Sequence, residues 1–318
     1  MAGQFQKLVS FGVGADSVGQ ECWERIEDAS TQIVEVADES ELRDQLTDAD
    51  ALLLSLGRGA DADLISSASN LRYIGMLGTG YGRIDLEAAR QQGVTVSNVA
   101  DYSTEAVAEF VFAVLLADLR DLDRAQAQAI EGDYDESGFG GTQVSSKTIG
   151  ILGLGNIGRR VAELASCGFG AKVVYWSRSP KDIGDVAGIT AVATPEEVIS
   201  AADVLSLHFE LNPETDGFLG PERLAMIQDG ALLINTAPME LIDLPALEDG
   251  LKGQKFSLIL DHSDEMDPGD AARLADCENC TVYPPIGYTT VEASAAKVEI
   301  FAQNITSFLE GSPQNVVS

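Results

Sequence analysis

The sequence predicts an α/β protein with two domains built on parallel sheets. Its 318 residues exceed the usual size of one domain, and an apolar content of 45% is enough for packed interiors. Short apolar runs alternate with helical stretches in two successive series, which is typical of parallel strands joined by helices. A glycine-rich turn opens the second series and indicates a dinucleotide-binding domain.

The first series extends from Leu8 to about Val99. The apolar runs LVSFGV, ALLLSL, RYIGMLG and VTVSNV predict buried strands, whereas the polar run ESELRDQL predicts a helix between two of them. This order predicts an α/β unit whose strands are parallel.

A long helix is expected next, over STEAVAEFVFAVLLADLRDLDRAQAQAI (103–130). Ser103 or Thr104 is the expected N-cap, Glu105 lies in the first turn, and apolar residues recur at helical spacing. We expect this helix to connect the two domains. The polar, glycine-rich run EGDYDESGFGGTQVSS then predicts a loop, and VEASAAKVEIFAQNITSFLEG predicts a last amphipathic helix after the second series.

The ionisable residues are strongly unbalanced, with 51 Asp and Glu against 20 Lys and Arg and a formal net charge of −31. Such a surface repels nucleic-acid phosphates and anionic lipids, so we expect no nucleic-acid partner and no membrane attachment. The carboxylates serve either general solubility or adaptation to high salt, where screening removes their mutual repulsion. The sequence shows neither a secretory signal nor an apolar run of roughly 18 residues, which predicts a cytoplasmic protein.

Cysteine usage supports neither a disulfide framework nor a metal site. The four cysteines are scattered, and Cys277 and Cys280 form a single C-x-x-C pair. A structural zinc needs four ligands, and the only histidines are His208 and His262. We therefore interpret the pair as loop cysteines rather than as a metal or redox site, and we predict no bound metal.

The run KTIGILGLGNIGRRVAELA predicts a dinucleotide-binding turn. An apolar strand leads into Gly153, Gly155 and Gly158 at G-x-G-x-x-G spacing, and a helix follows. The first glycine permits a tight turn, the second lets the backbone approach a pyrophosphate, and the third allows the helix to pack closely on the strand. The helix N-terminus would then face the phosphates, with Asn156 and Ile157 beside them.

The next strand, AKVVYWSRSP, bears on the choice between the two nicotinamide cofactors. Enzymes that prefer NAD carry Asp or Glu at its end, where the carboxylate binds the ribose hydroxyls and repels a 2′-phosphate. This sequence has Ser177, Arg178 and Ser179 there. Because hydroxyl and guanidinium groups suit a phosphate dianion, we predict NADP(H) over NAD. The alternative is that Arg178 is only a solvated residue at the strand end.

Several further segments are informative when they are taken together. They are GTGYGRIDLEAARQQGVTVSN, YSTEAVAEF, GILGLGNIGRRVA, ADVLSLHFELNPETDGFLGPERLAMIQDGALLINTA, LIDLPALEDGL and PPIGYTTVEA. On these segments the chain resembles the D-isomer-specific 2-hydroxyacid dehydrogenase family over nearly its whole length. The resemblance implies two Rossmann-like domains, with a dinucleotide-binding domain (102–285) inserted into a flavodoxin-like substrate domain (1–101 and 286–318). It also implies a homodimer, cofactor contacts at Thr236 and Asp261, and an active site between the domains.

The resemblance further implies three catalytic side chains: an Arg that binds the substrate carboxylate, a His that passes the proton, and a Glu that raises the pKa of that His. In ungapped alignment Pro238 replaces the Arg and Pro285 replaces the His. The Glu position falls on Met266 without a gap, or on Asp267 of the pair Asp267-Pro268 with one inserted residue. Proline offers neither a charge nor a transferable proton, so reduction of an ordinary 2-keto acid is not expected.

Other side chains have to supply the lost groups if the protein is an enzyme. Arg58 lies in the loop LGRG after a strand of the first domain, where it either presents a guanidinium to an anionic substrate or is merely exposed. His262 follows Asp261 at a strand end and can act as an acid near neutral pH, although the alternation of side chains along a strand favours a packing role. Asp267 is the remaining acidic candidate.

Two functional interpretations follow. In the first, the protein is an NADP(H)-dependent oxidoreductase that reduces a carbonyl, imine or activated alkene group of a small molecule, since an iminium accepts hydride without simultaneous protonation. In the second, it is a non-catalytic nucleotide-binding sensor or partner protein, a pseudoenzyme. The complete glycine loop and Arg178 favour cofactor binding under both interpretations, and we favour the oxidoreductase.

Overall fold

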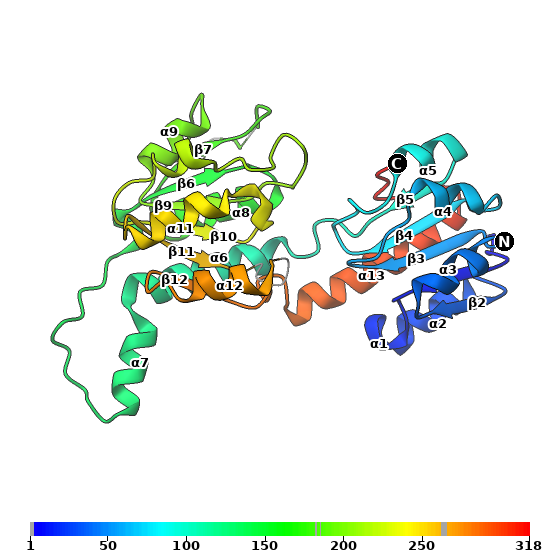
Figure 1. The fold of residues 1–318 in the computed structure, drawn as a ribbon, viewed down its shortest axis with the longest axis horizontal. Coiled ribbons are helices and arrows are strands. Elements are labelled where there is room, and N and C mark those ends of the chain that lie inside the picture. The colour runs from blue at the N-terminus through cyan, green and yellow to red at the C-terminus, as the bar shows by residue number, and fades with distance from the viewer. Residues whose placement is uncertain (1–2, 182, 185, 262–265) are drawn as a thin grey trace. The chain divides into compact units, whose positions relative to one another are not determined.

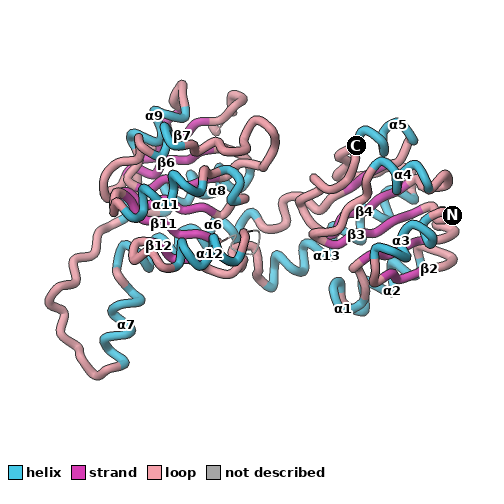
Figure 2. Tube along the Cα trace, in the orientation of Figure 1, coloured by secondary structure: helices cyan, strands magenta, loops and turns pink. Residues whose placement is uncertain are grey.

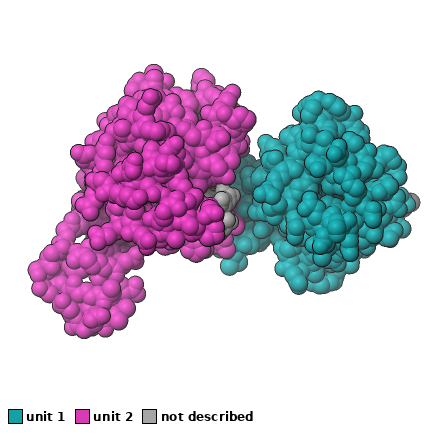
Figure 3. Space-filling model, in the orientation of Figure 1, with its two compact units in different colours: residues 1–102, 290–318 teal, residues 103–289 magenta. Residues whose placement is uncertain are grey.

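The computed structural model describes residues 3–181, 183–184, 186–261 and 266–318. The chain forms two compact units, residues 1–102 with 290–318 (unit 1) and residues 103–289 (unit 2). Figure 3 shows the two units in different colours. Unit 2 is continuous in sequence, whereas unit 1 is built from both ends of the chain. Unit 2 is therefore inserted into unit 1.

Unit 1 contains a parallel sheet with the strand order β2-β1-β3-β4-β5 (Figures 1 and 2). The strands are β1 (Leu8–Phe11), β2 (Ile33–Val36), β3 (Ala51–Ser55), β4 (Tyr73–Leu77) and β5 (Thr95–Ser97). The helices are α1 (Ala15–Val18), α2 (Gln20–Asp28), α3 (Glu39–Leu46), α4 (Ala62–Ser67), α5 (Leu86–Gln92) and α13 (Val291–Leu309). The strands and the helix predicted from the first series, and the predicted last helix, are confirmed.

Apolar cores cover both faces of this sheet. On one face α2 and α13 pack through residues such as Trp23 and Phe301, and on the other face α3 and α4 pack through Leu42 and Ile65. Every residue of β1 and β4 is buried. A parallel strand covered on both faces has a continuous apolar run instead of an alternating one, which explains the runs LVSFGV and RYIGMLG.

Unit 2 contains a parallel sheet with the strand order β12-β11-β10-β9-β6-β7-β8. The strands are β6 (Thr148–Leu152), β7 (Lys172–Trp176), β8 (Ile189–Ala191), β9 (Val204–Leu207), β10 (Ala231–Asn235), β11 (Phe256–Leu260) and β12 (Cys280–Val282). The helices are α6 (Thr104–Arg120), α7 (Leu122–Ile130), α8 (Asn156–Glu163), α9 (Pro195–Ala201), α10 (Pro221–Leu224), α11 (Leu244–Lys252) and α12 (Pro268–Ala275), with the short segments η1 (Val144–Ser146), η2 (Leu164–Gly168) and η3 (Met239–Leu241).

The chain winds outward from β6 in both directions of this sheet, which is the Rossmann arrangement. Unit 1 and unit 2 are thus both open parallel sheets with helices, and one is inserted into the other. The predicted fold class, two Rossmann-like domains with parallel sheets and an insertion, is confirmed.

The expected single helix over 103–130 is wrong in one respect, because it is interrupted at Asp121. This residue has a φ of 52°, in the left-handed region, and its N–H bonds to carbonyls in the last turn of α6. Helix α6 buries Val107 and Val111 among others, whereas α7 buries no residue. Burial therefore ends with α6, and α7 is a separate, exposed helix. No helix in the described ranges is long and apolar enough to cross a membrane.

Candidate functional site

The glycine-rich turn joins the buried end of β6 to the N-terminus of α8. Gly153 has a φ of 94°, and a Cβ there would lie 2.5 Å from the carbonyl oxygen of His208. A Cβ on Gly158 would lie 2.1 Å from the carbonyl oxygen of Gly153. Around Gly155, in contrast, a Cβ would meet no atom within 4 Å. Two glycines are therefore required by close packing, and the third leaves open space beside the backbone.

The start of α8 has the features of an anion site. Gly155 is the N-cap residue, so no side chain caps the helix there. The first backbone N–H groups of a helix have no partner within the helix, and together they carry partial positive charge. Asn156 and Ile157, the two predicted contacts, form the first turn. A diphosphate beside Gly155 would meet these N–H groups.

Thr236 provides an independent test of whether a dinucleotide fits this end of the sheet. It directly follows β10, and its Oγ1 is buried without a hydrogen-bond partner in the described part of the chain. Buried hydroxyls normally have a partner, so this one is open to a polar group of a ligand. Ligands of such sheets bind outside the carboxyl ends of the strands, where Thr236 and the glycine-rich turn lie. The residues present therefore fit a dinucleotide cofactor.

The predicted phosphate-binding residues follow β7. Ser177 is half-buried, and Arg178 and Ser179 are exposed. Arg178 Nη1 lies 2.8 Å from Oε2 of Glu214, which follows β9. Both side chains of this ion pair are more than 70% exposed, at 73% and 72%, so the pair contributes little stability. Glu214 gives no signal in the sequence, because it is one acid in a polar loop until the fold brings it beside Arg178.

Asp261 directly follows β11 and is buried. Its Oδ1 accepts a hydrogen bond from the N–H of Ile286 at 2.9 Å, and both carboxylate oxygens lie 3.1 Å from the nitrogen of Gly287. The carboxylate thereby fastens the segment that contains Pro285 to the end of the sheet. A contact of Asp261 with the cofactor stays a prediction.

The two prolines have defined structural settings in unit 2. Pro238 is half-buried and is the N-cap residue of η3, and Asn235 Oδ1 accepts a hydrogen bond from the N–H of Ala237 just before it, at 3.0 Å. Pro285 is half-buried and directly precedes Ile286 and Gly287, whose N–H groups donate to the Asp261 carboxylate; we call these hydrogen bonds the Asp261 clamp. Neither residue supplies a charge or a transferable proton.

The candidate catalytic residues are distributed over both units. Arg58 is exposed in unit 1, with its guanidinium carbon 4.2 Å from the ring centroid of Phe11. Asp267 is exposed in unit 2 and is the N-cap of α12, where its Oδ1 accepts a hydrogen bond from the N–H of Gly269 at 2.8 Å. Met266, the ungapped alternative, packs against the core of unit 2. His262 lies outside the described residues.

His208 is the histidine whose surroundings the structure describes. Its Nε2 lies 2.9 Å from Oγ of Ser206, and its carbonyl packs on Gly153. Burial lowers the pKa of His208 to about 3. The imidazole is therefore neutral near pH 7 and does not act as a general acid there.

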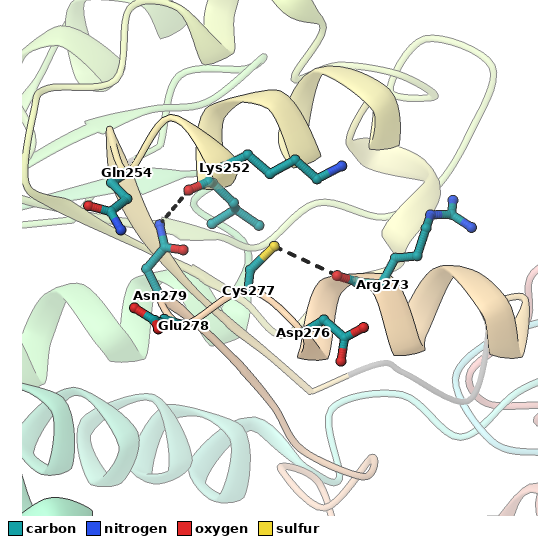
Figure 4. A pocket seen from close by; sticks show the side chains of 8 residues that line it. Lys252, Gln254, Arg273, Asp276, Cys277, Glu278 and Asn279 are labelled. Carbon is teal, nitrogen blue, oxygen red and sulfur yellow. Dashed lines mark hydrogen bonds between the residues drawn. The ribbon is translucent and has the colours of Figure 1, made fainter.

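Cys277 lines a small pocket at the edge of unit 2, drawn in Figure 4. Its Sγ contacts the carbonyl oxygen of Arg273 at 3.7 Å, and the cavity of about 300 Å³ also contains Lys252. Burial, followed by the nearby Cys277, raises the pKa of Cys280 to about 12, so this sulfur stays a thiol. Among the described residues there is no group of three or more His, Cys, Asp or Glu that could hold a metal ion.

Comparisons with known proteins place this geometry among dinucleotide-binding enzymes. The family model "D-isomer specific 2-hydroxyacid dehydrogenase, NAD binding domain" matches residues 112–287. The chain is 35% identical to the D-3-phosphoglycerate dehydrogenase of Methanocaldococcus jannaschii over 87% of this chain and 53% of that protein. It is 32% identical to the glyoxylate reductase of Thermococcus litoralis over 87% of this chain and 86% of that protein. The chain thus spans about half the length of the first relative and most of the second.

A solved structure with the same fold is that of an acyclic imino acid reductase (Bsp5) in complex with NADPH and D-Arg. It is 27% identical in sequence to this chain, with a TM-score of 0.85, and the match covers 98% of this chain and 100% of that one.

Proposed function

Because the chain belongs to the D-isomer-specific 2-hydroxyacid dehydrogenase family, we propose that it is an NADP(H)-dependent oxidoreductase with an altered catalytic site. Its substrate is a small molecule with a carbonyl, imine or activated alkene group, not an ordinary 2-keto acid. The proposal is carried by the complete cofactor turn together with Pro238 and Pro285, which we predict to stand at the positions of the family's Arg and His.

The chain's own residues hold the cofactor in this proposal. The N-terminus of α8 and Gly155 take the diphosphate, and Thr236 donates or accepts a hydrogen bond at the carboxyl end of β10. Asn156, Ile157 and Asp261 complete the predicted set around this end of the sheet. Bound there, the reduced nicotinamide would supply a hydride.

NADP(H) is preferred over NAD in this proposal because of Ser177, Arg178 and Ser179. A guanidinium and two hydroxyls suit a 2′-phosphate, and no carboxylate stands among these three residues. Glu214 competes for Arg178, so the phosphate has to displace an exposed ion pair, which costs little. The complex of the imino acid reductase with NADPH also supports this choice.

The proposed substrates need less help from a protein acid than a keto acid does. Reduction of a ketone develops an alkoxide that must be protonated, whereas a protonated imine is already cationic when it accepts hydride. Pro238 and Pro285 cannot donate a proton, and His208 is neutral near pH 7. An imine is therefore the substrate most compatible with these residues. Arg58, His262 and Asp267 stay the candidates for substrate binding and proton transfer.

The test is NADPH consumption with a panel of substrates. Imines formed from 2-oxo acids with ammonia or methylamine are compared with pyruvate, glyoxylate and hydroxypyruvate alone. We expect faster oxidation of NADPH with the imines. Rapid turnover of the free keto acids would contradict the altered catalytic site. Tight NADPH binding without turnover of any compound would favour the alternative, a non-catalytic nucleotide sensor.

The oligomer expected for this family is a homodimer, and exposed apolar side chains on unit 2 support it. Helix α7 buries no residue, and Leu122, Ile130 and Tyr134 are 50%, 80% and 83% exposed. An apolar surface of this kind is typical of interfaces. Size-exclusion chromatography with light scattering should show a dimer for the parent and monomers for Ile130→Asp, whereas a parent monomer would contradict the proposal.

The cytoplasm is the proposed location. All four cysteines, Cys22, Cys167, Cys277 and Cys280, are free, which fits a reducing compartment. A supply of reduced cofactor is also required there by the proposed reaction. Detection of the protein in a cell fraction outside the cytoplasm would contradict this location.

A further inference from the structure

Unit 1 has its own potential ligand site at the carboxyl ends of β1 and β3. In its sheet order β2-β1-β3-β4-β5, the helix that follows β1 packs on one face and the helix that follows β3 packs on the other. The chain therefore leaves these neighbouring strands in opposite directions and opens a crevice between them. Ligands of open parallel sheets bind at this switch point.

A pocket of about 340 Å³ occupies this place. Phe11 at the end of β1 and the loop 57–61 after β3 form part of its wall. Three arginines line it from three different segments, Arg43 on α3, Arg58 after β3 and Arg83 after β4. The pocket lies wholly within unit 1.

The backbone and an aromatic ring position these arginines. Arg83 Nη1 donates a hydrogen bond to the carbonyl oxygen of Gly57 at 3.2 Å, and Arg43 Nη1 donates one to the carbonyl oxygen of Asp63 at 3.2 Å. Arg58 lies over the ring of Phe11. Each guanidinium has five N–H donors, so these contacts leave most of them available.

The three arginines differ from most others in lacking an ion pair within the described residues, although the chain has 51 Asp and Glu. Most arginines in the described residues form an ion pair with Asp or Glu, namely Arg25, Arg72, Arg90, Arg124, Arg159, Arg160, Arg178, Arg223 and Arg273. No ion pair within the described ranges involves Arg43, Arg58, Arg83 or Arg120. Three of these four arginines therefore line one pocket in a protein with a net charge of −31.

Two acidic side chains also line the pocket, but neither neutralises the arginines by direct pairing. Asp61 is the N-cap of α4, and its Oδ1 accepts a hydrogen bond from the N–H of Leu64 at 2.7 Å. Glu39 lies in the first turn of α3, where the helix dipole favours a negative charge. Both carboxylates thus have favourable settings at helix N-termini, and no ion pair in the described residues joins either of them to the three arginines. Asp38, the N-cap of α3, accepts a hydrogen bond from the N–H of Ser40, which together with a weaker electrostatic interaction with Arg58 lowers the pKa of this acid.

We propose that Arg43, Arg58 and Arg83 bind an oxyanion, the phosphoryl or carboxylate group of a small molecule, in this pocket of unit 1. Planar guanidinium groups match the geometry of such oxyanions and bind them through paired, charge-assisted hydrogen bonds. The inference rests on the proposed function only at Arg58, which is also a candidate for binding the substrate. Binding of an oxyanion in the pocket requires neither the cofactor nor a reaction.

The test is isothermal titration calorimetry on the full chain, without cofactor and at low ionic strength. The probes are inorganic phosphate, glycerol 3-phosphate and malonate, which represent a free ion, a phosphate ester and a dicarboxylate. We expect at least one probe to bind the parent. Arg43→Ala, Arg58→Ala and Arg83→Ala should each weaken that binding by about tenfold or more, because each removes charge-assisted hydrogen bonds. The probe that binds most tightly identifies the source of the oxyanion.

Arg120→Ala is the matched control. It removes one exposed arginine without an ion pair in the described residues, so it changes the net charge equally but lies outside the pocket. Thermal unfolding of each variant without probe shows whether it is folded. Arg58→Lys keeps the positive charge but loses the paired N–H donors of the guanidinium, so its affinity for the probe should be intermediate. The inference is overturned if no probe binds the parent, or if Arg120→Ala weakens binding as much as the pocket variants do. NADPH turnover is measured separately, so failure here leaves the proposed reaction standing.

Discussion

Asp261 holds Gly287 through both of its carboxylate oxygens, each 3.1 Å from the Gly287 nitrogen. The acid follows β11, and the glycine lies beyond β12, so this contact fixes the return of the chain after the last strand. The same segment contains Pro285, which we predict to stand where the family has its proton-transferring His. The contacts of Asp261 thus give this segment an ordered frame.

Gly287→Ala should destabilise unit 2. A Cβ there would lie 2.6 Å from Oδ2 of Asp261 and 3.2 Å from Cδ1 of Phe110, so the clamp or the ring has to move. Overpacking of this kind costs about 1–3 kcal/mol in free energy of unfolding. Urea denaturation measures the loss, and an unchanged midpoint would mean that the clamp tolerates the methyl group.

Gly155→Ala should separate cofactor binding from stability. A Cβ at this position meets no atom within 4 Å, and the backbone φ of −74° suits alanine, so the free energy of unfolding should hardly change. The added methyl group would occupy the space through which the diphosphate approaches the backbone. We expect NADPH binding to weaken about tenfold or more, as read from quenching of tryptophan fluorescence. Unchanged affinity would place the diphosphate elsewhere.

Arg178→Ala and Glu214→Gln should move NADPH affinity in opposite directions. The first substitution removes the cation proposed for the 2′-phosphate, and the second removes the carboxylate that lies 2.8 Å from it. We expect NADPH to bind about tenfold more weakly to Arg178→Ala and more tightly to Glu214→Gln. NADH, which lacks the phosphate, is the internal control and should bind Arg178→Ala as it binds the parent. A parent that prefers NADH would remove the assignment of NADP(H).

Sequence patterns were informative where local chemistry determines structure and silent where tertiary contacts do. The polar run ESELRDQL predicted α3, and the structure gives the local reasons: the Asp38 side chain caps this helix, and Leu42 and Leu46 are buried. The break at Asp121 escaped prediction because the helical spacing continues across it, and only burial ends there. The Arg178–Glu214 pair likewise joins two loops that follow separate strands. No spacing rule connects such residues before the sheet order is known.

Stability should fall faster with acid in the parent than in His208→Asn. Burial lowers the pKa of His208 to about 3 in the folded state, against about 6.5 in the unfolded chain. As the pH falls, this imidazole is therefore protonated first in the unfolded state. The contribution of neutral His208 to the free energy of unfolding is complete above pH 6.5 and is lost as the pH falls toward 3. At pH 5 the loss amounts to at most about 2 kcal/mol relative to pH 7. Equal losses in both proteins between these pH values would show that the imidazole is solvated.

Potassium chloride should stabilise the protein if the acidic surface is an adaptation to high salt. At low ionic strength the net charge of −31 destabilises the folded state through self-repulsion, and molar salt screens charges beyond about 3 Å. The midpoint of thermal unfolding should therefore rise steadily from low to molar KCl. Exposed ion pairs such as Arg178–Glu214 weaken under the same conditions, so a net rise requires that repulsion outweighs them. A constant or falling midpoint would leave general solubility as the role of the carboxylates.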